Sequence, residues 1–540
     1  MLDISKESDI METLTNLHNG GILMKLNYKR TILVGFAFFL ISAFWQAYDA
    51  TIPVILTNKF GMSQTWSGVI MALDNILAVF MLPLFGALSD KCSTRFGKRT
   101  PFITIGAIIA AVALIALSFV DNRQLKLINE VSAIDDPHAL EILYDTQCNK
   151  DLLTPEGDQI LLSEEFSRKE FAAIRCKIID SETGKTITNP DYTNFVAPAR
   201  QAYVRDLTAA NKTNLVLFVA LLLVILVAMA TFRSPAVALM PDVTMKPLRS
   251  KANAIINLMG TAGGILVLVL GMVFSTSAVQ NAMMSYTLYY AIIASIMLIA
   301  LTVFLCTVRE PKWAAQMAED SIKYGIEEQT AGTGEKRSLT ASEKKSLICI
   351  LLSIALWYFG YNAVTSKYAV YAGNILDKDY NTTMLLAQGA AIAAYLPAGT
   401  VASKIGRKKT ILGGVVMLAT AFGCAAFMRS SSPTLVMNIL FALAGVAWAT
   451  INVNSFPMVV EMCSGADIGK YTGFYYTASM TAQIVTPMLS GFLMDKMGMT
   501  VLFPYAAIFV ALAFVTMSLV KHGDAKVIAK QGLEALSSED

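Results

Sequence analysis

Twelve long apolar segments constrain this chain more than any other feature of its sequence. Each is about 20 residues long, the length that a helix needs to cross the hydrocarbon core of a bilayer. Lipid cannot hydrogen-bond an open backbone, so segments of this kind must be helical. The sequence therefore predicts an all-α membrane protein. Its spans are placed at 31–57, 66–89, 101–120, 214–240, 252–275, 285–308, 346–372, 383–403, 410–429, 434–457, 470–493 and 500–520.

The composition agrees with this class and excludes several others. Of the 540 residues 55% are hydrophobic and 15% are charged, against about 25% charged in soluble proteins. A net charge of +3 gives no reason to expect a nucleic-acid partner. The seven cysteines lack CxxC or His-paired spacing, so we expect no metal site and no cofactor. The GTGEK stretch at 332–336 lacks the first glycine of a P-loop, and no enzymatic activity is expected.

The connections between the spans predict how the chain is oriented. Basic clusters all fall on one side of the membrane if the N-terminus starts there, which makes both termini cytoplasmic. We expect a multi-pass protein of the cell membrane. The clusters lie at 25–30, 91–99, 246–251, 404–409 and within 309–345.

The same spacing divides the chain into two halves of six spans each. The predicted parts are a cytoplasmic tail at 1–30, an N-terminal half at 31–308, a cytoplasmic linker at 309–345, a C-terminal half at 346–520 and a second tail at 521–540.

One polar segment, residues 121–213, interrupts the N-terminal half between its third and fourth spans. It carries 16 acidic and 11 basic residues, a bias that suits the non-cytoplasmic face. Either a small folded cap or a spacer fits this composition. Cys148 and Cys176 fit equally well as a disulfide of an oxidising compartment or as two free thiols.

An internal repeat relates the two halves. The stretch Gly86–Ile103 is a small-residue turn with a knot of Lys and Arg, and Ala398–Ile411 is its shortened echo. Tyr48-Asp49-Ala50 matches Tyr361-Asn362-Ala363 with an offset of 313 residues, and Gly86 matches Gly399 with the same offset. Many secondary transporters alternate access by rocking one such half against the other, with the substrate held between them. The repeat therefore predicts a two-domain transporter.

The basic turn and its flanks also carry a family resemblance. The chain resembles the major facilitator superfamily, and within it the sucrose–proton symporters, which are close to the glycoside–pentoside–hexuronide cation symporters. This resemblance implies twelve helices in two pseudo-symmetric halves and symport of a sugar with a proton. It rests on Thr65-Trp66, Pro83-Leu84-Phe85-Gly86, Ser89-Asp90-Lys91-Cys92, Arg95-Phe96-Gly97-Lys98-Arg99, Pro101-Phe102-Ile103, Ser234-Pro235, Ala238-Leu239, Asp242, Arg249 and Ala252-Asn253-Ala254.

The chain departs from these relatives where their ions bind. Two acidic residues of the sodium-coupled relatives align with Ala78 and Leu82, so that sodium site is absent. The sucrose symporters carry an Asp in the fourth span that 215–231 lacks, and their arginine there aligns with Val237. The substrate and coupling residues are therefore sought among this chain's own polar span residues.

Charged side chains inside a span are costly and usually functional. Asp49 and Asp74 lie at similar distances from the outer ends of their spans, so both carboxyls can reach one cavity as proton-coupling groups. Structural salt bridges are the alternative for both residues. We prefer Asp49 because its repeat partner, Asn362, is neutral. Arg233 can hold sugar hydroxyls or pair with a carboxylate, whereas Lys367 is expected near the outer surface with its ammonium reaching toward the headgroups.

A sugar site needs neutral hydrogen-bonding groups and aromatic faces. Some polar residues of a span only join helices to one another, so part of this set is expected to be packing. The predicted substrate-binding residues are Asn75, Arg233, Asn257, Tyr361, Asn362, Gln388, Trp448, Asn452 and Gln483, and Gln46 is a further polar span residue.

The basic turn itself is predicted to act mechanically. Asp90 can pair with Arg95 or Arg99, and such pairs would hold the two halves together while the transporter faces outward. The second copy of the turn has Ser403 in place of the acid, so its latch should be weaker.

Three functions fit the sequence. The favoured one is proton-coupled symport of a di- or oligosaccharide by alternating access, with a sugar, H+ and the lipid bilayer as partners. The alternative is an exporter or uniporter of another small metabolite or drug. The acidic residues inside the spans argue against a plain uniporter, which needs no coupling group. The third is a non-transporting membrane sensor, which is disfavoured because the sequence pattern predicts no cytoplasmic signalling domain.

Overall fold

The computed structural model describes residues 26–179, 184, 186–245, 248–323, 339–460, 462 and 468–523. Most of the two predicted tails and residues 324–338 of the predicted linker lie outside these ranges.

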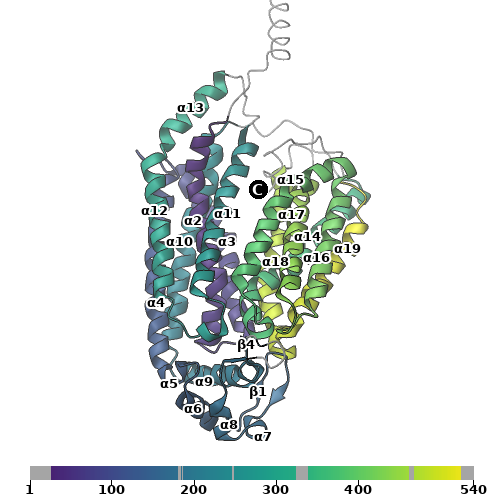
Figure 1. Ribbon diagram of the computed structural model, residues 1–540. Coiled ribbons are helices and arrows are strands. Elements are labelled where there is room, and N and C mark those ends of the chain that lie inside the picture. The colour runs from purple at the N-terminus through teal and green to yellow at the C-terminus, as the bar shows by residue number, and fades with distance from the viewer. Residues whose placement is uncertain are drawn as a thin grey trace, which may run out of the picture.

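Each of the twelve predicted spans coincides with one long helix. The helices form two halves that stand side by side (Figure 1), which confirms the all-α class and the two-half architecture. The N-terminal half contains α2 (Tyr28–Asn58), α3 (Gln64–Lys91), α4 (Thr100–Leu127), α10 (Thr213–Val243), α11 (Arg249–Phe274) and α12 (Thr287–Thr307). The C-terminal half contains α14 (Ala341–Tyr371), α15 (Tyr380–Ile405), α16 (Arg407–Ala425), α17 (Thr434–Val460), α18 (Ile468–Met497) and α19 (Leu502–Ser518).

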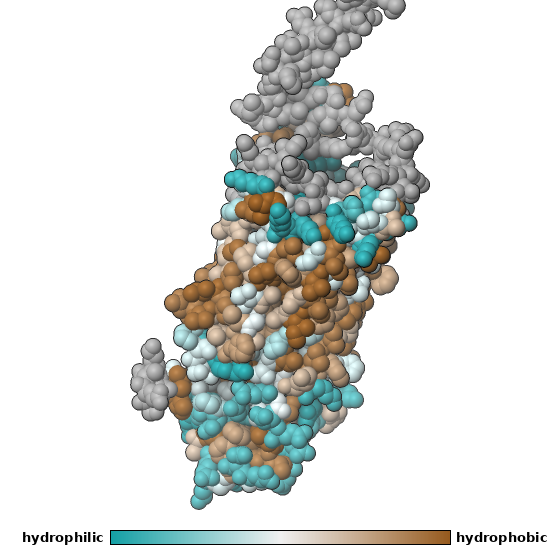
Figure 2. Space-filling model, turned by 90° about the vertical axis from the view of Figure 1, so that its right-hand side faces the viewer, coloured by the Kyte–Doolittle hydropathy of each residue, from teal (hydrophilic) through white to brown (hydrophobic). Residues whose placement is uncertain are grey.

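Ten helices of the described chain are long and apolar enough to cross a membrane. The helices α15 and α18 are not among them, because their sequences are richer in hydroxyl and amide side chains. Figure 2 shows apolar side chains over the middle of the helices and hydrophilic ones over the segment that follows α4. Hydrophilic side chains also lie at the opposite end of the helices, so the distribution is that of a bilayer-embedded bundle with polar ends.

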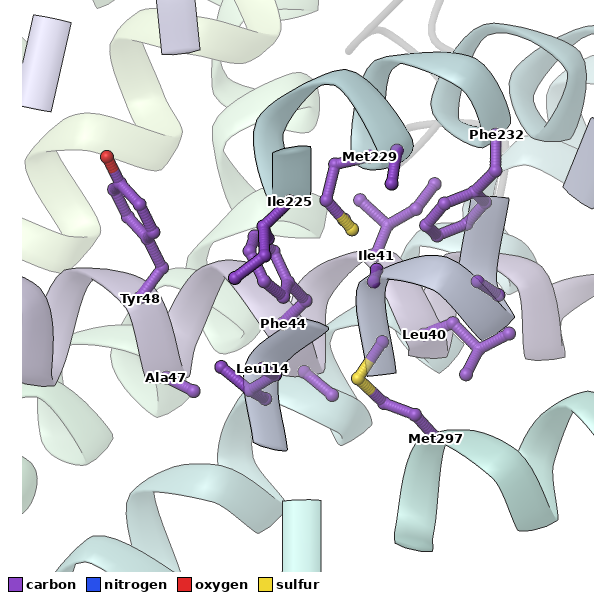
Figure 3. Close-up of a cluster of buried hydrophobic side chains, with 14 of the residues drawn as sticks. Leu40, Ile41, Phe44, Ala47, Tyr48, Leu114, Ile225, Met229, Phe232 and Met297 are labelled. Atoms are coloured by element: carbon purple, nitrogen blue, oxygen red, sulfur yellow. The ribbon is translucent and has the colours of Figure 1, made fainter. Parts of the chain in front are cut away.

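Each half has its own hydrophobic core. In the N-terminal half Phe44 of α2, Leu114 of α4, Ile225 of α10 and Met297 of α12 converge on one cluster (Figure 3). A second cluster fills the C-terminal half around residues such as Trp357. The second cluster also takes in Ala50 and Val54 of α2 and Leu268 of α11, so the two packed halves touch through apolar contacts as well.

The polar insertion is a folded unit, not a spacer. It begins later than predicted, because α4 continues to Leu127. A third cluster of buried residues, including Leu140, Phe171 and Val196, forms its core. Its elements are α5 (Asn129–Ser132), α6 (Pro137–Gln147), β1 (Leu152–Leu153), β2 (Gln159–Ile160), α7 (Leu162–Glu165), α8 (Arg168–Ala173), β3 (Lys177–Ile179), β4 (Thr186–Thr188), η1 (Tyr192–Val196) and α9 (Ala197–Ala210), with β1–β2 and β3–β4 as antiparallel hairpins.

The end of the bundle that carries this unit is called the insertion end, and the end that carries the basic turn after α3 is called the basic end. In Figure 1 the insertion lies below both halves, and the helices of the two halves diverge toward the opposite, basic end.

Both cysteines of the insertion are free thiols in the structure. Cys176 is fully buried, and burial together with the nearby Asp135 raises the pKa of its thiol to about 11. A raised thiol pKa means that the reactive thiolate is scarce at neutral pH. Cys148 is only partly buried.

We therefore expect a maleimide to modify Cys148 in the native protein and Cys176 only after unfolding. Peptide mass spectrometry of native and denatured samples, labelled without reductant, measures this difference. A Cys148–Cys176 disulfide, or rapid labelling of native Cys176, would contradict it.

A buried ion pair closes the insertion end of the N-terminal half. Lys59, directly after α2, donates to both carboxylate oxygens of Asp121 in α4 at 2.7 Å, and both side chains have no exposed surface. The ammonium also donates to the carbonyl of Met284 at 2.7 Å and lies 4.5 Å from the ring centre of Tyr286. The predicted bounds of the polar insertion, 121–213, include Asp121. It belongs instead to the packed helices, where it ties α2 to α4 and to the start of α12.

Candidate substrate and coupling site

A cavity of about 460 Å³ lies between the two halves. Its walls come from α2, α10 and α11 on one side and from α14, α15 and α17 on the other. A smaller compartment of about 200 Å³ adjoins it and reaches α3 and α18. Four residues line both spaces and so join them: Trp45, Asp49, Arg233 and Thr365.

The structure brings nearly all of the predicted coupling and substrate residues into these two spaces. Asn452 is the exception, since it lines neither. The large compartment contains Asp49, Arg233, Asn257, Tyr361, Gln388 and Trp448. The small compartment contains Asp49, Asp74, Asn75, Arg233, Asn362 and Gln483.

The small compartment concentrates charge. Asp74 accepts a hydrogen bond from Asn75 Nδ2 at 2.9 Å. Arg233 lies over the ring of Trp45, 5.8 Å from its centre. Within the described residues no carboxylate lies within ion-pair distance of Arg233, although Asp74 shares its compartment. The guanidinium is therefore placed to pair with a carboxylate or a ligand in another state of the protein.

Several buried donors of the small compartment have no hydrogen-bond partner among the described residues. They are Trp45 Nε1, Tyr48 Oη and Asn362 Nδ2. Figure 3 shows Tyr48 at the edge of the N-terminal cluster, with its hydroxyl pointing away from the other labelled side chains. Because buried polar groups are nearly always satisfied, these atoms are suited to binding water or a hydroxylated ligand.

The large compartment has an aromatic wall. The rings of Tyr361 and Trp448 stack with centres 3.6 Å apart and planes inclined by 5°, and Tyr358 meets Trp448 edge-on at 5.2 Å. Flat aromatic faces suit the C–H surface of a sugar ring as well as other apolar groups. The compartment is also lined by the apolar residues Phe38, Ile41, Val364, Met384 and Phe441.

A chain of amides joins the halves beside this wall. Gln388 Nε2 of α15 donates to Gln46 Oε1 of α2 at 2.7 Å, and Gln46 Nε2 donates to Tyr380 Oη at 3.3 Å. Gln46 lies one helical turn before Asp49 on the same face of α2, so the bridge adjoins the proposed coupling group.

Sequence reasoning missed Thr365 and Ser366, which line the small compartment. A signal for them exists, because they follow Asn362 by three and four residues and so share its helical face. The sequence pattern gives Trp45 no role beyond that of a core or interface aromatic, and its place in both compartments follows only from the packing.

Lys367 does not reach toward the headgroups as predicted. It is fully buried, and its ammonium donates to the carbonyl of Gln64 at the start of α3, at 2.5 Å. The side chain is enclosed because the start of α3 lies against this part of α14.

Next to it, Asp495 near the end of α18 caps α3 from the other half. Its carboxylate accepts hydrogen bonds from the backbone N–H groups of Gln64 and Thr65, both at 2.7 Å, and from Thr65 Oγ1 at 2.5 Å. A carboxylate is stabilised at a helix N-terminus by the free N–H groups and the helix dipole. Asp495 and Lys367 thus close the insertion end between α3, α14 and α18.

The predicted gating residues form a cluster at the basic end. Arg99 contacts Asp90 at 2.5 Å and Asp242 at 2.8 Å, and it also contacts the hydroxyl of Ser89. Arg95 lies over the ring of Phe96 instead of pairing with Asp90. All of these contacts stay within the N-terminal half, joining α3, α4 and α10. In this conformation, in which the halves diverge at the basic end, the pair does not bridge the two halves, and the bridge expected in the outward-facing state stays a prediction.

Glu310, which the sequence did not single out, holds the same turn. It is buried and begins α13 (Glu310–Lys323). Its carboxylate accepts from the backbone N–H groups of Lys98, Arg99 and Thr100 at 2.6–2.9 Å. The first residues of the predicted linker are therefore bound to the start of α4.

Two six-helix halves with a polar cavity between them define the fold class of the major facilitator transporters. The chain matches the model of the MFS_1 like family over residues 36–505, and it belongs to that family. The predicted membership in the major facilitator superfamily is confirmed.

Curated relatives match over shorter stretches. The MFS-type transporter ppzB of Metarhizium rileyi is 26% identical over 132 residues, which cover 24% of this chain and 27% of ppzB. Sucrose transport protein SUC4 of Arabidopsis thaliana is 30% identical over 74 residues, 14% of each protein. Human proton-associated sugar transporter A is 34% identical over 107 residues, 20% of this chain and 13% of that protein. The chain thus matches about a quarter, or less, of the length of these relatives.

A solved structure matches over nearly the whole chain. The inward-open xylose transporter XylE from E. coli superimposes with a TM-score of 0.55 and 16% identity, covering 94% of this chain and 98% of XylE. At this identity the likeness establishes the fold alone.

Proposed function

We propose that this protein is a secondary active transporter that couples the movement of a proton to that of a sugar. The observation that carries the proposal is the pair of joined compartments between the halves. One is small and contains both carboxyls and Arg233, and the other is larger, with amides and an aromatic wall. Asp49 and Arg233 line both, so the occupant of one space lies next to the charges of the other.

The larger compartment suits a ligand of sugar size. Its volume of about 460 Å³ lies within the range of about 300–1,000 Å³ that small-molecule sites occupy. Together with the adjoining compartment, it offers room for a di- or oligosaccharide. The names of a plant sucrose transport protein and a human proton-associated sugar transporter, both similar over part of their length, support the same substrate class.

Asp49 is the preferred coupling group. A charged carboxyl inside the membrane disfavours a closed, water-free state, whereas a protonated one does not. The carrier would then cross between its two open states with Asp49 protonated and sugar bound, or with both sites empty and the Asp49 carboxylate compensated by Arg233, which lines the same spaces. Asp74 lines only the small compartment, where it can exchange the proton with Asp49 or pair with Arg233.

We further propose that the basic end faces the cytoplasm. The basic turn at Lys91–Arg99 and the echo at Lys404–Lys409 lie there, whereas the acidic insertion lies at the other end. This arrangement follows the rule that cytoplasmic loops carry the excess of Lys and Arg. In this orientation the structure is closed to the outside.

Uptake of labelled sugars into proteoliposomes tests the function. Purified protein is reconstituted, a pH gradient is imposed, and mono-, di- and trisaccharides are offered singly. We expect accumulation of at least one di- or oligosaccharide that collapses when a protonophore removes the gradient. Uptake that ignores the gradient would overturn proton coupling. A blank sugar panel alongside transport of an amphipathic metabolite would favour the exporter or uniporter alternative.

A further inference from the structure

The insertion belongs mechanically to the N-terminal half. It leaves α4 and returns through α9 into α10, so both of its ends are covalently joined to that half. Val279 and Met283, in the connection before α12, pack against its core. Gln201 of α9 donates to the carbonyl of Met62 in the turn between α2 and α3, at 3.4 Å. When the halves move relative to one another, the insertion must therefore move with the N-terminal half.

Its surface nevertheless docks on the C-terminal half. Thr188, at the end of β4, donates from its backbone N–H and its hydroxyl to the carboxylate of Asp377, at 3.2 and 2.6 Å. The backbone N–H of Met499, after α18, donates to the carbonyl of Pro155 at 2.7 Å. Arg429, between α16 and α17, forms an ion pair with Glu156 of the insertion, with 3.8 Å between Nε and Oε1. Three separate connections of the C-terminal half are thus held by one unit.

The backbone at this contact is shaped for close approach. Gly157 of the insertion and Gly498 after α18 both have positive φ angles. Each lies so close to the backbone around the other that a Cβ atom on either residue would collide with it. Asp377 is one of two non-glycine residues with positive φ in the described chain. Strained backbone of this kind persists only where the surrounding contacts maintain it. Two surfaces that only happened to lie side by side would need neither the close backbone approach nor the positive φ angles found at this contact.

The docked insertion lies directly over the closed end of the transport path. Asp495 and Gln64, which join α18 to α3, line a polar chamber of about 300 Å³ whose other walls come from the insertion, including Asp151 and Arg205. This chamber lies at the boundary between the halves, on the insertion side of the contact between Asp495 and Gln64. The contact between Gln64 and Asp495 and the contacts that dock the insertion therefore lie one above the other along the boundary between the two halves.

From these contacts we propose that the insertion is a clasp, by which we mean a folded unit of the N-terminal half that holds the C-terminal half at the insertion end. Its docking surface, formed by Thr188 and Pro155, fits the outer ends of the C-terminal half at Asp377 and Met499, and it must detach before the cavity can open at the insertion end. This inference rests on the alternating access of the proposed function but not on the identity of the solute or the ion. Docking stabilises the conformation described here and opposes the opposite one.

A reversible cross-link tests the clasp without any substrate. Thr188→Cys and Asp377→Cys are combined with the reporter Ser366→Cys, which lies in the small compartment, in a protein whose seven native cysteines are replaced by serine. Disulfide formation should lower labelling of the reporter by a membrane-impermeant maleimide, added from the insertion side, about tenfold or more. Selective reduction of the cross-link should restore it.

The matched control joins two residues of the insertion itself. Lys150 and Asp206 form an exposed ion pair at 2.6 Å, and a Lys150→Cys/Asp206→Cys cross-link should leave reporter labelling unchanged. Equal labelling with and without the Thr188–Asp377 cross-link would overturn the proposal. If sugar uptake failed while the cross-link still protected the reporter, the clasp would stand and only the sugar assignment would fall.

A milder variant guards against misfolding of the cysteine-free protein. Thr188→Val removes one hydrogen bond to a charged group, so opening at the insertion end should become more frequent by about tenfold to a hundredfold. This is measured in the protein with its native cysteines, as the rate at which a cysteine at Ser366 is labelled from the insertion side, after subtraction of labelling in a protein without that cysteine. Thr186→Val, on the exposed start of the same strand, is the control. Equal rates for the two variants would contradict the clasp.

Discussion

Asp49→Asn is expected to abolish sugar accumulation driven by a pH gradient while leaving sugar exchange across the membrane intact. Asparagine imitates a permanently protonated carboxyl, so the carrier can move without a proton and the gradient no longer drives it. A charge at mid-bilayer costs about 2.5–3.5 kcal/mol, a bias of about a hundredfold between the charged and neutral forms. Accumulation should fall by a factor of that order. The variant also reproduces the second half of the repeat, where Asn362 stands at the matching position.

The measurement compares gradient-driven uptake with counterflow in the same proteoliposomes. Asp145→Asn, the same chemical change at a half-exposed side chain of the insertion, should leave both rates as in the wild type. Asp74→Asn separates the two acids, because Asp74 lines the small compartment only. Full accumulation by Asp49→Asn together with its loss in Asp74→Asn would transfer the coupling role to Asp74.

Breaking the buried pair of Lys59 and Asp121 should destabilise the protein more than any surface substitution. Lys59→Met leaves the Asp121 carboxylate buried without its partner, and removing one member of a buried ion pair costs about 3–5 kcal/mol. The double variant Lys59→Met/Asp121→Leu leaves no unpaired charge, and it should recover most of that loss. Denaturant or thermal unfolding in detergent, followed by the same probe for each variant, measures the difference.

The exposed pair of Lys150 and Asp206 provides the comparison. Their side chains are 49% and 47% exposed, and exposed pairs contribute about 0.2–1 kcal/mol. Lys150→Met should therefore change the unfolding free energy little. A Lys59→Met variant as stable as Lys150→Met would show that Asp121 gains other partners, or a proton, when Lys59 is lost.

The positions of the spans were predictable because the requirement for them is local. A run of about 20 apolar residues has to form a helix in lipid whatever surrounds it. The predicted boundary failed at α4, which continues as a helix through Asp121 to Leu127. Polar residues there end the apolar run but not the helix, since Lys59 and the folded insertion provide their partners. Hydropathy marks where lipid ends, whereas the helix ends where its packing ends.

The candidate site was predictable in part for the same reason. Ionisable and amide side chains inside spans are costly, so most of them were expected to face one cavity, and all but Asn452 of the predicted set line it. The predicted position of Lys367 was wrong, and the partner of Asp90 was only one of two that the sequence allowed. Lys367 is held by Gln64 across the boundary between the halves, whereas the exposed Asp90 pairs with Arg99 of its own half. Both depend on which helices are neighbours in this conformation.

By itself, then, the sequence determined the twelve helices, their division into two related halves and the chemical groups available between them. It could do so because bilayer crossing, internal duplication and residue cost are properties of short segments. Only the tertiary structure decided that Asp49 and Arg233 stand where two compartments join, that Asp495 caps a helix of the other half, and that the insertion clasps both halves. These arrangements depend on how each helix is rotated and which helix it packs against. The rotation and the neighbours of a helix are determined by contacts between residues hundreds of positions apart, so they cannot be predicted from any one segment.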